Sequence, residues 1–229
     1  MKKFIVLLLA VNGYVASGKE PELTADPSPK SLESFAPRSS GNGEGNVHFF
    51  YDIELGYAAM SASGPYAFHQ GAFLYGGDVG VRFNVRSKTI ASANHVTIAV
   101  GGYEANMSSF HSSTLRGHIS YTHFWCFGGG DNAGLFWQAG ILPTYLYTVT
   151  DKHDADYSSH ANRLFFEPTV SFGFHIRFVM VSRRTGNELG GGRAFVGPFL
   201  NYGIGNLSKD AGETMNPGYK IGVRWSYVF

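Results

Sequence analysis

The sequence predicts an all-β fold: a closed antiparallel transmembrane barrel of eight strands, preceded by a disordered N-terminal tail. Three observations predict it. From residue 47 to the end of the chain, apolar residues alternate with polar ones, and alternate side chains of a strand leave opposite faces of a sheet. The apolar face is rich in aromatic residues, and the polar face carries charges of both signs. Ten strands remain the alternative count, and the register between strands stays open.

Composition indicates which face is covered by lipid. The 229 residues include 19 Phe, 13 Tyr and 30 Gly, and charged residues make up 15% of the chain, below the roughly 25% of soluble domains. A water-soluble sandwich carries many Lys and Glu residues on its outer faces, whereas Lys is scarce in these segments. An apolar outside around a polar lumen is the arrangement of transmembrane barrels. The sheet must then close, because unpaired backbone groups are not tolerated in lipid.

Net charge and cysteine content exclude other classes. A net charge of +1 gives no bulk attraction to nucleic acid, so we expect no nucleic-acid partner. The single Cys126 excludes an internal disulfide framework and a multi-cysteine metal site.

The N-terminal part of the chain predicts export. Residues 1–18 hold two lysines, an apolar run and small residues, which is typical of a secretory signal peptide. The apolar run is too short to span a bilayer. Residues 19–46 are rich in Pro, Ser and Gly and predict a disordered periplasmic tail. Residues 47–229 form the predicted barrel, and we expect the protein in the bacterial outer membrane.

The predicted strands cover residues 47–57, 73–85, 95–103, 115–125, 135–145, 163–178, 193–202 and 219–229. In the first strand, Phe and Tyr residues lie opposite Asp52 and Glu54, and in the second, Phe and Val residues lie opposite Asp78 and Arg82. The third strand is the weakest, with Val and Ile opposite His95.

The other five strands repeat the pattern. Leu, Ile and aromatic residues lie opposite Arg116 in the fourth strand and opposite Gln138 in the fifth. The sixth has a long Phe-rich face opposite Glu167, and the seventh has Val, Leu and Tyr opposite Asn201. In the eighth, aromatic residues lie opposite Arg224.

Three prolines conflict with this regular pattern. Pro143, Pro168 and Pro198 each remove a donor from the hydrogen-bond ladder, and a closed barrel has no edge strand to hold them. We expect bulges or near-rim positions at these residues.

Charged residues of both signs face the predicted lumen. They are Asp52, Glu54, Asp78, Arg82, Arg116, Glu167, Arg177, Lys220 and Arg224. An eight-stranded barrel is just wide enough to be filled by side chains, and buried charges must be paired. We therefore predict an interior charge cluster with a structural role; a proton path is the alternative. Because the first and last strands must pair, we expect Asp52 to meet Arg224, with Glu54 and Lys220 higher on the same face.

The last thirteen residues, PGYKIGVRWSYVF, end on an aromatic strand whose outward residues are Val223, Trp225, Tyr227 and Phe229. Together with the signal peptide and eight alternating segments, this strand resembles the small bacterial outer-membrane barrels of the OmpA/OmpX-like type. The resemblance implies that these four residues form the signal read by the barrel-assembly machinery. It also implies contact with outer-membrane lipid and lipopolysaccharide.

Three functional classes remain open. The first is a non-enzymatic structural or anchoring barrel, including a subunit of an envelope or secretion assembly such as a type IX secretion-like barrel subunit. Such a subunit would contact periplasmic or envelope proteins through the 19–46 tail or the periplasmic turns. The second is a lipid A-modifying acyltransferase or deacylase. The third is a surface adhesin or a small pore, and open channels need about sixteen strands.

No residue is assigned as catalytic, cofactor-binding or metal-ligating. The segment 151–160 gathers Asp and His residues that suit a divalent ion, but their spacing matches no recognised site. His118 and His175 face the predicted lumen, where we expect satisfied interior histidines.

Overall fold

The computed structural model describes residues 47–63, 68–85, 92–107, 110–127, 132–151, 162–181, 188–209, 212 and 214–229. The chain divides into two units, Met1–Gly43 and Glu44–Phe229. The predicted signal peptide, the predicted tail and residues 152–160 of the Asp- and His-containing segment lie outside the described residues.

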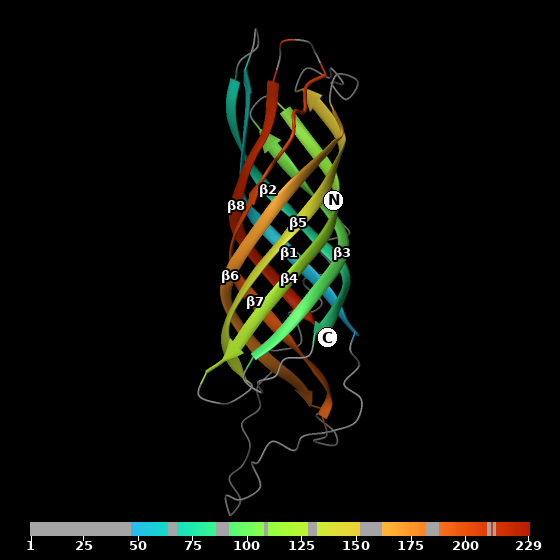
Figure 1. Cartoon of the computed structure of the whole chain (residues 1–229), viewed down its shortest axis with the longest axis vertical. Coiled ribbons are helices and arrows are strands. Elements are labelled where there is room, and N and C mark those ends of the chain that lie inside the picture. The colour runs from blue at the N-terminus through green and yellow to red at the C-terminus, as the bar shows by residue number, and fades with distance from the viewer. Residues whose placement is uncertain are drawn as a thin grey trace, which may run out of the picture. The chain divides into compact units, whose positions relative to one another are not determined.

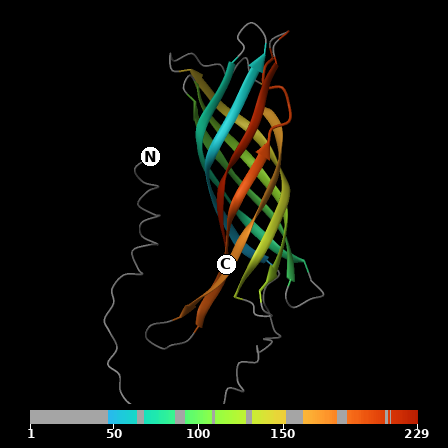
Figure 2. The ribbon, with the colours of Figure 1, turned by 90° about the vertical axis from the view of Figure 1, so that its left-hand side faces the viewer.

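The described part of the second unit is a closed antiparallel barrel, which confirms the predicted fold class. Its eight strands are β1 (Val47–Ser63), β2 (Phe68–Val85), β3 (Ser92–Met107), β4 (Phe110–Cys126), β5 (Ala133–Asp151), β6 (Leu164–Val181), β7 (Glu188–Tyr202) and β8 (Thr214–Val228). Each strand pairs with its sequence neighbours, and β1 pairs with β8. Two views at right angles show strands strongly tilted to the barrel axis (Figures 1 and 2). Most strands extend beyond the predicted segments, because strand pairing continues past the residues in which apolar and polar side chains alternate strictly.

Closure brings the start of β1 beside the end of β8. Phe49 and Phe229 exchange backbone hydrogen bonds with N···O distances of 3.2 and 3.0 Å. We call this end of the barrel, where the C-terminus lies in Figure 1, the lower end. The β2–β3, β4–β5 and β6–β7 connections lie at the lower end, and the other hairpin connections lie at the upper end.

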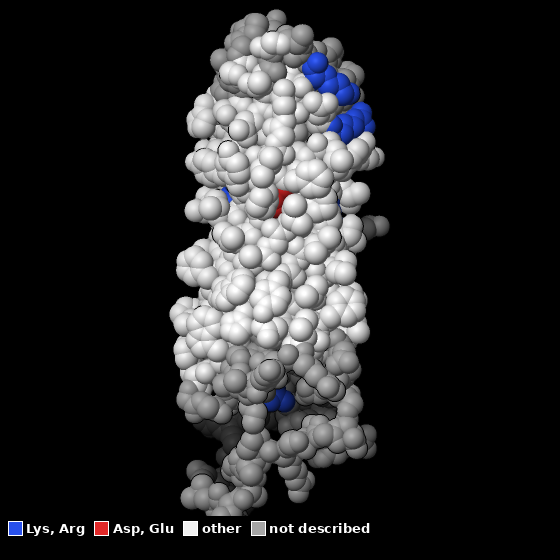
Figure 3. All heavy atoms as spheres, viewed as in Figure 1, with Lys and Arg blue, Asp and Glu red and all other residues white. Residues whose placement is uncertain are grey.

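The outer face of the barrel is an apolar belt. It exposes large apolar residues from every strand, among them Phe49, Phe73, Ile98, Ile119, Trp137, Phe172, Leu200 and Trp225, which are 41–66% exposed. Figure 3 shows a broad band of this surface almost free of Lys, Arg, Asp and Glu. From Tyr219 to Phe229, β8 rises ~33 Å along the strand, which at a tilt of ~40° is ~25 Å along the axis, the height of a lipid-facing belt.

The three prolines do not shift the register, so the expected bulges are absent at them, and only Pro168, the fifth residue of β6, has the near-rim position expected as the alternative. Pairing across Pro143 stops between Arg116↔Thr144 and Ile119↔Ile141, and it resumes in the same register. Gly117 makes room for the Pro143 ring, since a Cβ there would lie 3.1 Å from the ring. Pro198 likewise interrupts the β6–β7 pairing in mid-strand, and the Ser171 hydroxyl donates to its carbonyl at 2.8 Å. Pro168 pairs with Ile141 on one side and lies opposite the end of β7 on the other.

A true register shift occurs between β1 and β8 at Ala59/Ser61. The extra residue lies on β8, where Gly218 has a positive φ of 68°. A Cβ at Gly218 would lie 1.7 Å from the backbone oxygen of Ala59. The bulge therefore requires glycine for both its backbone conformation and its close approach.

We expect Gly218→Ala to destabilise the barrel by ~1–3 kcal/mol. Gly212→Ala is the matched control, because Gly212 also has a positive φ (83°) but has nothing within 4 Å of its ideal Cβ. Urea unfolding followed by tryptophan fluorescence compares the two. Equal losses would show that the close approach to Ala59 contributes nothing.

No helix in the described part of the chain is long and apolar enough to cross a membrane.

Candidate functional site

The predicted interior charges gather in the middle of the lumen, with one exception. The buried ones, each no more than 4% exposed, are Asp52, Glu54, Asp78, Arg82, Arg116, Glu167, Lys220 and Arg224. Four carboxylates therefore accompany four cations, which is the charge balance that a low-dielectric interior requires.

Arg177 is the exception, and its predicted place in the cluster is wrong. Its side chain is exposed. Alternation identifies the side of the sheet correctly but not the height along the barrel. The Arg177 N–H donates to Asn132 O beside the β4–β5 connection, so this residue lies at the lower rim.

Glu54 and Asp78 are each held by arginine from another strand. Arg116 donates from Nε and Nη2 to the two Asp78 oxygens, both at 2.9 Å, and its Nη1 lies 2.8 Å from Glu54 Oε2. Arg224 donates from Nε to Glu54 Oε1 at 2.8 Å, and its Nη2 lies 2.6 Å from the same oxygen. One carboxylate thus bridges two guanidinium groups, and this bridge joins β1, β4 and β8.

The expected register, with Asp52 level with Arg224, is wrong by two residues. Glu54, not Asp52, lies directly opposite Arg224, and Ser226 lies opposite Asp52. The Asp52 carboxylate instead accepts the backbone N–H of Asp78 at 2.8 Å, where β1–β2 pairing is interrupted. Its other oxygen is 3.8 Å from Arg224 Nε. The error arises because the estimate of height ignored the shear between strands.

His118 extends the cluster into a closed ring of contacts. Asp78 Oδ2 lies 2.7 Å from His118 Nδ1, and His118 Nε2 lies 2.9 Å from Ser120 Oγ. Because a carboxylate only accepts, Nδ1 must carry the proton, and in the neutral ring Nε2 then accepts from the Ser120 hydroxyl.

The ring continues through Gln138. Its Nε2 donates to Ser120 Oγ at 2.7 Å, and its Oε1 accepts from Arg224 Nη1 at 3.1 Å. We call the residues of this ring the lumen circuit: Glu54, Asp78, Arg116, His118, Ser120, Gln138 and Arg224. Ser120 and Gln138 share the polar faces of their strands with the predicted charges but were not predicted as part of the site. The alternation Arg116, His118, Ser120 along β4 was the available signal.

Lys220 and Arg82 form separate contacts above and below the lumen circuit. Lys220 is hydrogen-bonded to Glu167, which also accepts from the Thr144 hydroxyl at 3.0 Å. Arg82 Nε donates to the Thr97 hydroxyl at 3.0 Å. Lys220 lies opposite Asn201 and Ala58 in its neighbouring strands, and its ammonium group binds Glu167 rather than Glu54.

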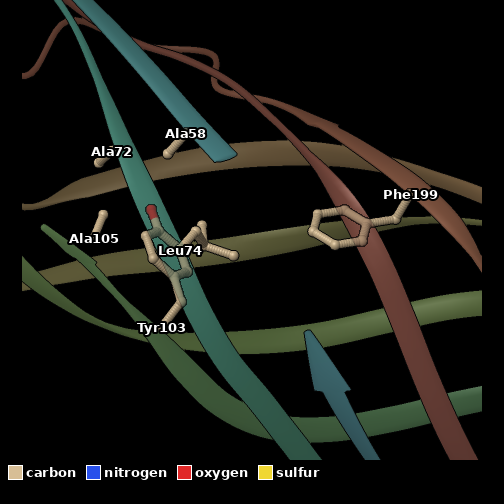
Figure 4. Packing of buried hydrophobic residues seen from close by; sticks show 6 residues of the cluster. All are labelled: Ala58, Ala72, Leu74, Tyr103, Ala105 and Phe199. Carbon is tan, nitrogen blue, oxygen red and sulfur yellow. The ribbon is translucent and has the colours of Figure 1, made fainter. Parts of the chain in front are cut away.

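Apolar clusters lie in the lumen above and below the charges. The upper layer consists of Ala58, Ala72, Leu74, Tyr103, Ala105 and Phe199, whose side chains converge inside the barrel (Figure 4). The lower layer consists of Phe50, Ala99, Phe124, Phe136, Phe195 and Val228. Two buried cations lie over aromatic rings of these clusters. The Arg82 guanidinium is 4.7 Å from the centre of the Phe195 ring, and the Lys220 ammonium is 4.6 Å from the centre of the Tyr103 ring.

Asp52, Asp78 and His118 have the donor types of a metal site. One ligand atom from each lies within 4.8 Å of the others. However, Arg116 already binds both Asp78 oxygens, and the four cations of the layer already balance its four carboxylates. A divalent cation would add two uncompensated charges to this interior. The residues therefore do not fit a metal ion.

The four residues of the predicted assembly signal lie on the outer face of β8. Val223, Trp225 and Phe229 are 51%, 50% and 39% exposed. Tyr227 is half-buried, because its ring stacks on Tyr51 of β1 with centroids 4.9 Å apart. The terminal strand thus presents an aromatic ladder at the lower end of the belt.

No family model matches the chain, and no curated protein matches it.

Proposed function

We propose that the chain is an integral outer-membrane β-barrel of the small OmpA/OmpX-like type, acting as a structural or anchoring component of the envelope. The observation that carries this proposal is the inverted distribution of polarity: a 41–66% exposed aromatic and aliphatic outside surrounds buried ion pairs. Lipid is the solvent in which such an outside is stable. The aromatic ladder of β8 is its proposed assembly signal.

The tryptophans provide a direct test of the lipid-facing belt. The chain has 3 Trp, and Trp125, Trp137 and Trp225 are 37%, 41% and 50% exposed on the outer face. After refolding into vesicles, we expect their fluorescence to be quenched by lipids brominated on the acyl chains. Acrylamide, a water-soluble quencher, should have little effect. The reverse result would contradict the membrane assignment.

A filled lumen favours the structural role over a pore. Buried side chains occupy the lumen at the level of the charges and of the apolar clusters above and below them. An eight-stranded barrel filled by side chains conducts little. We expect no stable conductance steps in planar bilayers. Regular single-channel steps, absent with refolding buffer alone, would favour the pore.

One observation favours a second candidate, a lipid-modifying enzyme. Asp78, His118 and Ser120 are arranged as in a nucleophile–base–carboxylate relay. We place it second because Ser120 is 3% exposed and lies between the two apolar layers. Turnover of labelled lipid A by the wild type but not by Ser120→Ala would reverse this order.

A further inference from the structure

The carboxamide of Asn201 is buried in the lumen without a hydrogen-bond partner. Asn201 of β7 is 0% exposed, and neither its Oδ1 nor its Nδ2 has a partner among the described residues. A buried amide that forms no hydrogen bonds costs free energy, so its presence in a folded protein requires an explanation. The groups that surround Asn201 supply one.

A lysine side chain passes over the strand that carries Asn201. Lys220 of β8 lies directly opposite Asn201, and opposite residues of an antiparallel pair have Cβ atoms ~5 Å apart. Lys220 is 2% exposed, and its ammonium group binds Glu167 of β6. Because β7 lies between β6 and β8, the Lys220 side chain crosses the inner face of β7 to reach Glu167. The amine and the carboxamide therefore share one small region of the lumen.

Glu167 is held in place as a base for this amine. It is 0% exposed, and its second carboxylate oxygen accepts the Thr144 hydroxyl at 3.0 Å. Aromatic rings border the same amine: Lys220 Nζ is 4.6 Å from the centre of the Tyr103 ring and 5.5 Å from that of Phe165. Such surroundings exclude water, which would compete with an internal nucleophile.

We propose that Lys220 and Asn201 form an isopeptide bond in the folded barrel, with Glu167 as the general acid and base. Glu167 takes one proton from the Lys220 ammonium group, and the neutral amine attacks Cγ of Asn201. The Nζ–Cγ bond forms and the Cγ–Nδ2 bond breaks. Glu167 relays a second proton from Nζ to Nδ2, which leaves as ammonia. The reaction consumes no oxidant, reductant or other reactant.

The product keeps the charge balance of the lumen. Lys220 loses its charge, and Glu167 retains the first proton as a neutral carboxylic acid, so three of the four buried carboxylates and three of the four buried cations stay charged. The bond joins β7 to β8 covalently and holds the two strands together when their backbone hydrogen bonds open. This inference goes beyond the proposed function, because it does not depend on what covers the outer belt.

Intact-mass spectrometry of the full chain before and after refolding in detergent micelles tests the proposal. The unfolded chain from inclusion bodies should have the mass of its sequence, and the refolded chain should be lighter by one molecule of ammonia. Lys220→Arg, Asn201→Ala and Glu167→Gln should each keep their full mass after refolding. Lys209→Arg, which replaces an exposed lysine outside the lumen, should lose ammonia as the wild type does. Heat-modifiable gel mobility checks that every variant is folded.

Tryptic peptides of the refolded wild type locate the bond without any variant. Trypsin cleaves after Lys and Arg, so Asn201 lies in peptide 194–209 and Lys220 ends peptide 210–220. An acylated lysine resists trypsin, and we therefore expect peptide 194–209 joined to peptide 210–224.

A refolded wild type that keeps its full mass and releases unmodified peptide 210–220 would overturn the proposal. Loss of ammonia by folded Asn201→Ala or Lys220→Arg would show that the bond lies elsewhere. Loss of ammonia by folded Glu167→Gln at the rate of the wild type would exclude Glu167 as the base.

Discussion

Glu54→Ala is expected to lower the free energy of unfolding by ~3–5 kcal/mol, because it leaves a buried arginine without its carboxylate partner. Glu54 is fully buried and receives Arg224 at 2.6 Å and Arg116 at 2.8 Å. Arg116 keeps its bidentate contact with Asp78, but Arg224 loses its closest carboxylate. Arg224→Ala should cost a similar amount. The measurement is urea unfolding of the refolded protein in phospholipid vesicles.

A double-mutant cycle separates this contact from general damage to the lumen. The loss of unfolding free energy in Glu54→Ala/Arg224→Ala should be smaller than the sum of the losses in the two single variants, because the double variant leaves no unpaired charge. Asp52→Ala with Arg224→Ala is the matched cycle, since these side chains approach only to 3.8 Å. Its coupling energy should be clearly smaller. A larger coupling with Asp52 than with Glu54 would contradict the β1–β8 register.

The second large effect concerns the belt. Phe172 lies in the middle of β6 and is 66% exposed on the outer face. Phe172→Arg should cost ~2–4 kcal/mol in vesicles, as expected for a cation placed near the midplane of a bilayer. Exposed positions of a water-soluble protein normally tolerate such a change within about 0.5 kcal/mol.

Leu164→Arg is the control for depth. Leu164 is on the same strand and the same face and is 61% exposed, but it lies at the upper end beside Arg163. Its cost should be only ~0–1 kcal/mol. If both variants unfold at the same urea concentration as the wild type, lipid does not cover this face.

Side-chain alternation was enough to predict the fold and the identity of the buried charges. It identifies which residues share a face, so Glu54, Asp78, Arg116 and Arg224 could be assigned to the lumen from sequence alone. It gives no information on shear, and the partner of Arg224 was therefore placed two residues away, at Asp52. Arg177 was misplaced for a related reason, because the pattern continues unchanged beyond the rim.

The lumen circuit needs three-dimensional information of another kind. Ser120 and Gln138 are small or neutral residues that fit many positions on a polar face, and their role depends on the distance across β4 and β5. His118 was expected to be a satisfied interior histidine. Its neighbour Asp78 lies on β2 and its neighbour Ser120 on β4, and β3 lies between these two strands.

The composition of the lumen circuit bears on how the sheet closes. Six of its seven members come from β1, β2, β4 and β5, and only Arg224 comes from the last strand. While β8 is unpaired, Glu54 and Gln138 both lack Arg224. The carboxylates of the lumen are then only partly neutralised, and a charge without a partner is more stable in water than buried. Final strand pairing therefore supplies the missing charge at the same moment as it supplies the backbone bonds. A sheet that joined β1 to β8 out of register would gain backbone bonds but leave Glu54 without Arg224, so we expect it to be less stable than the native register.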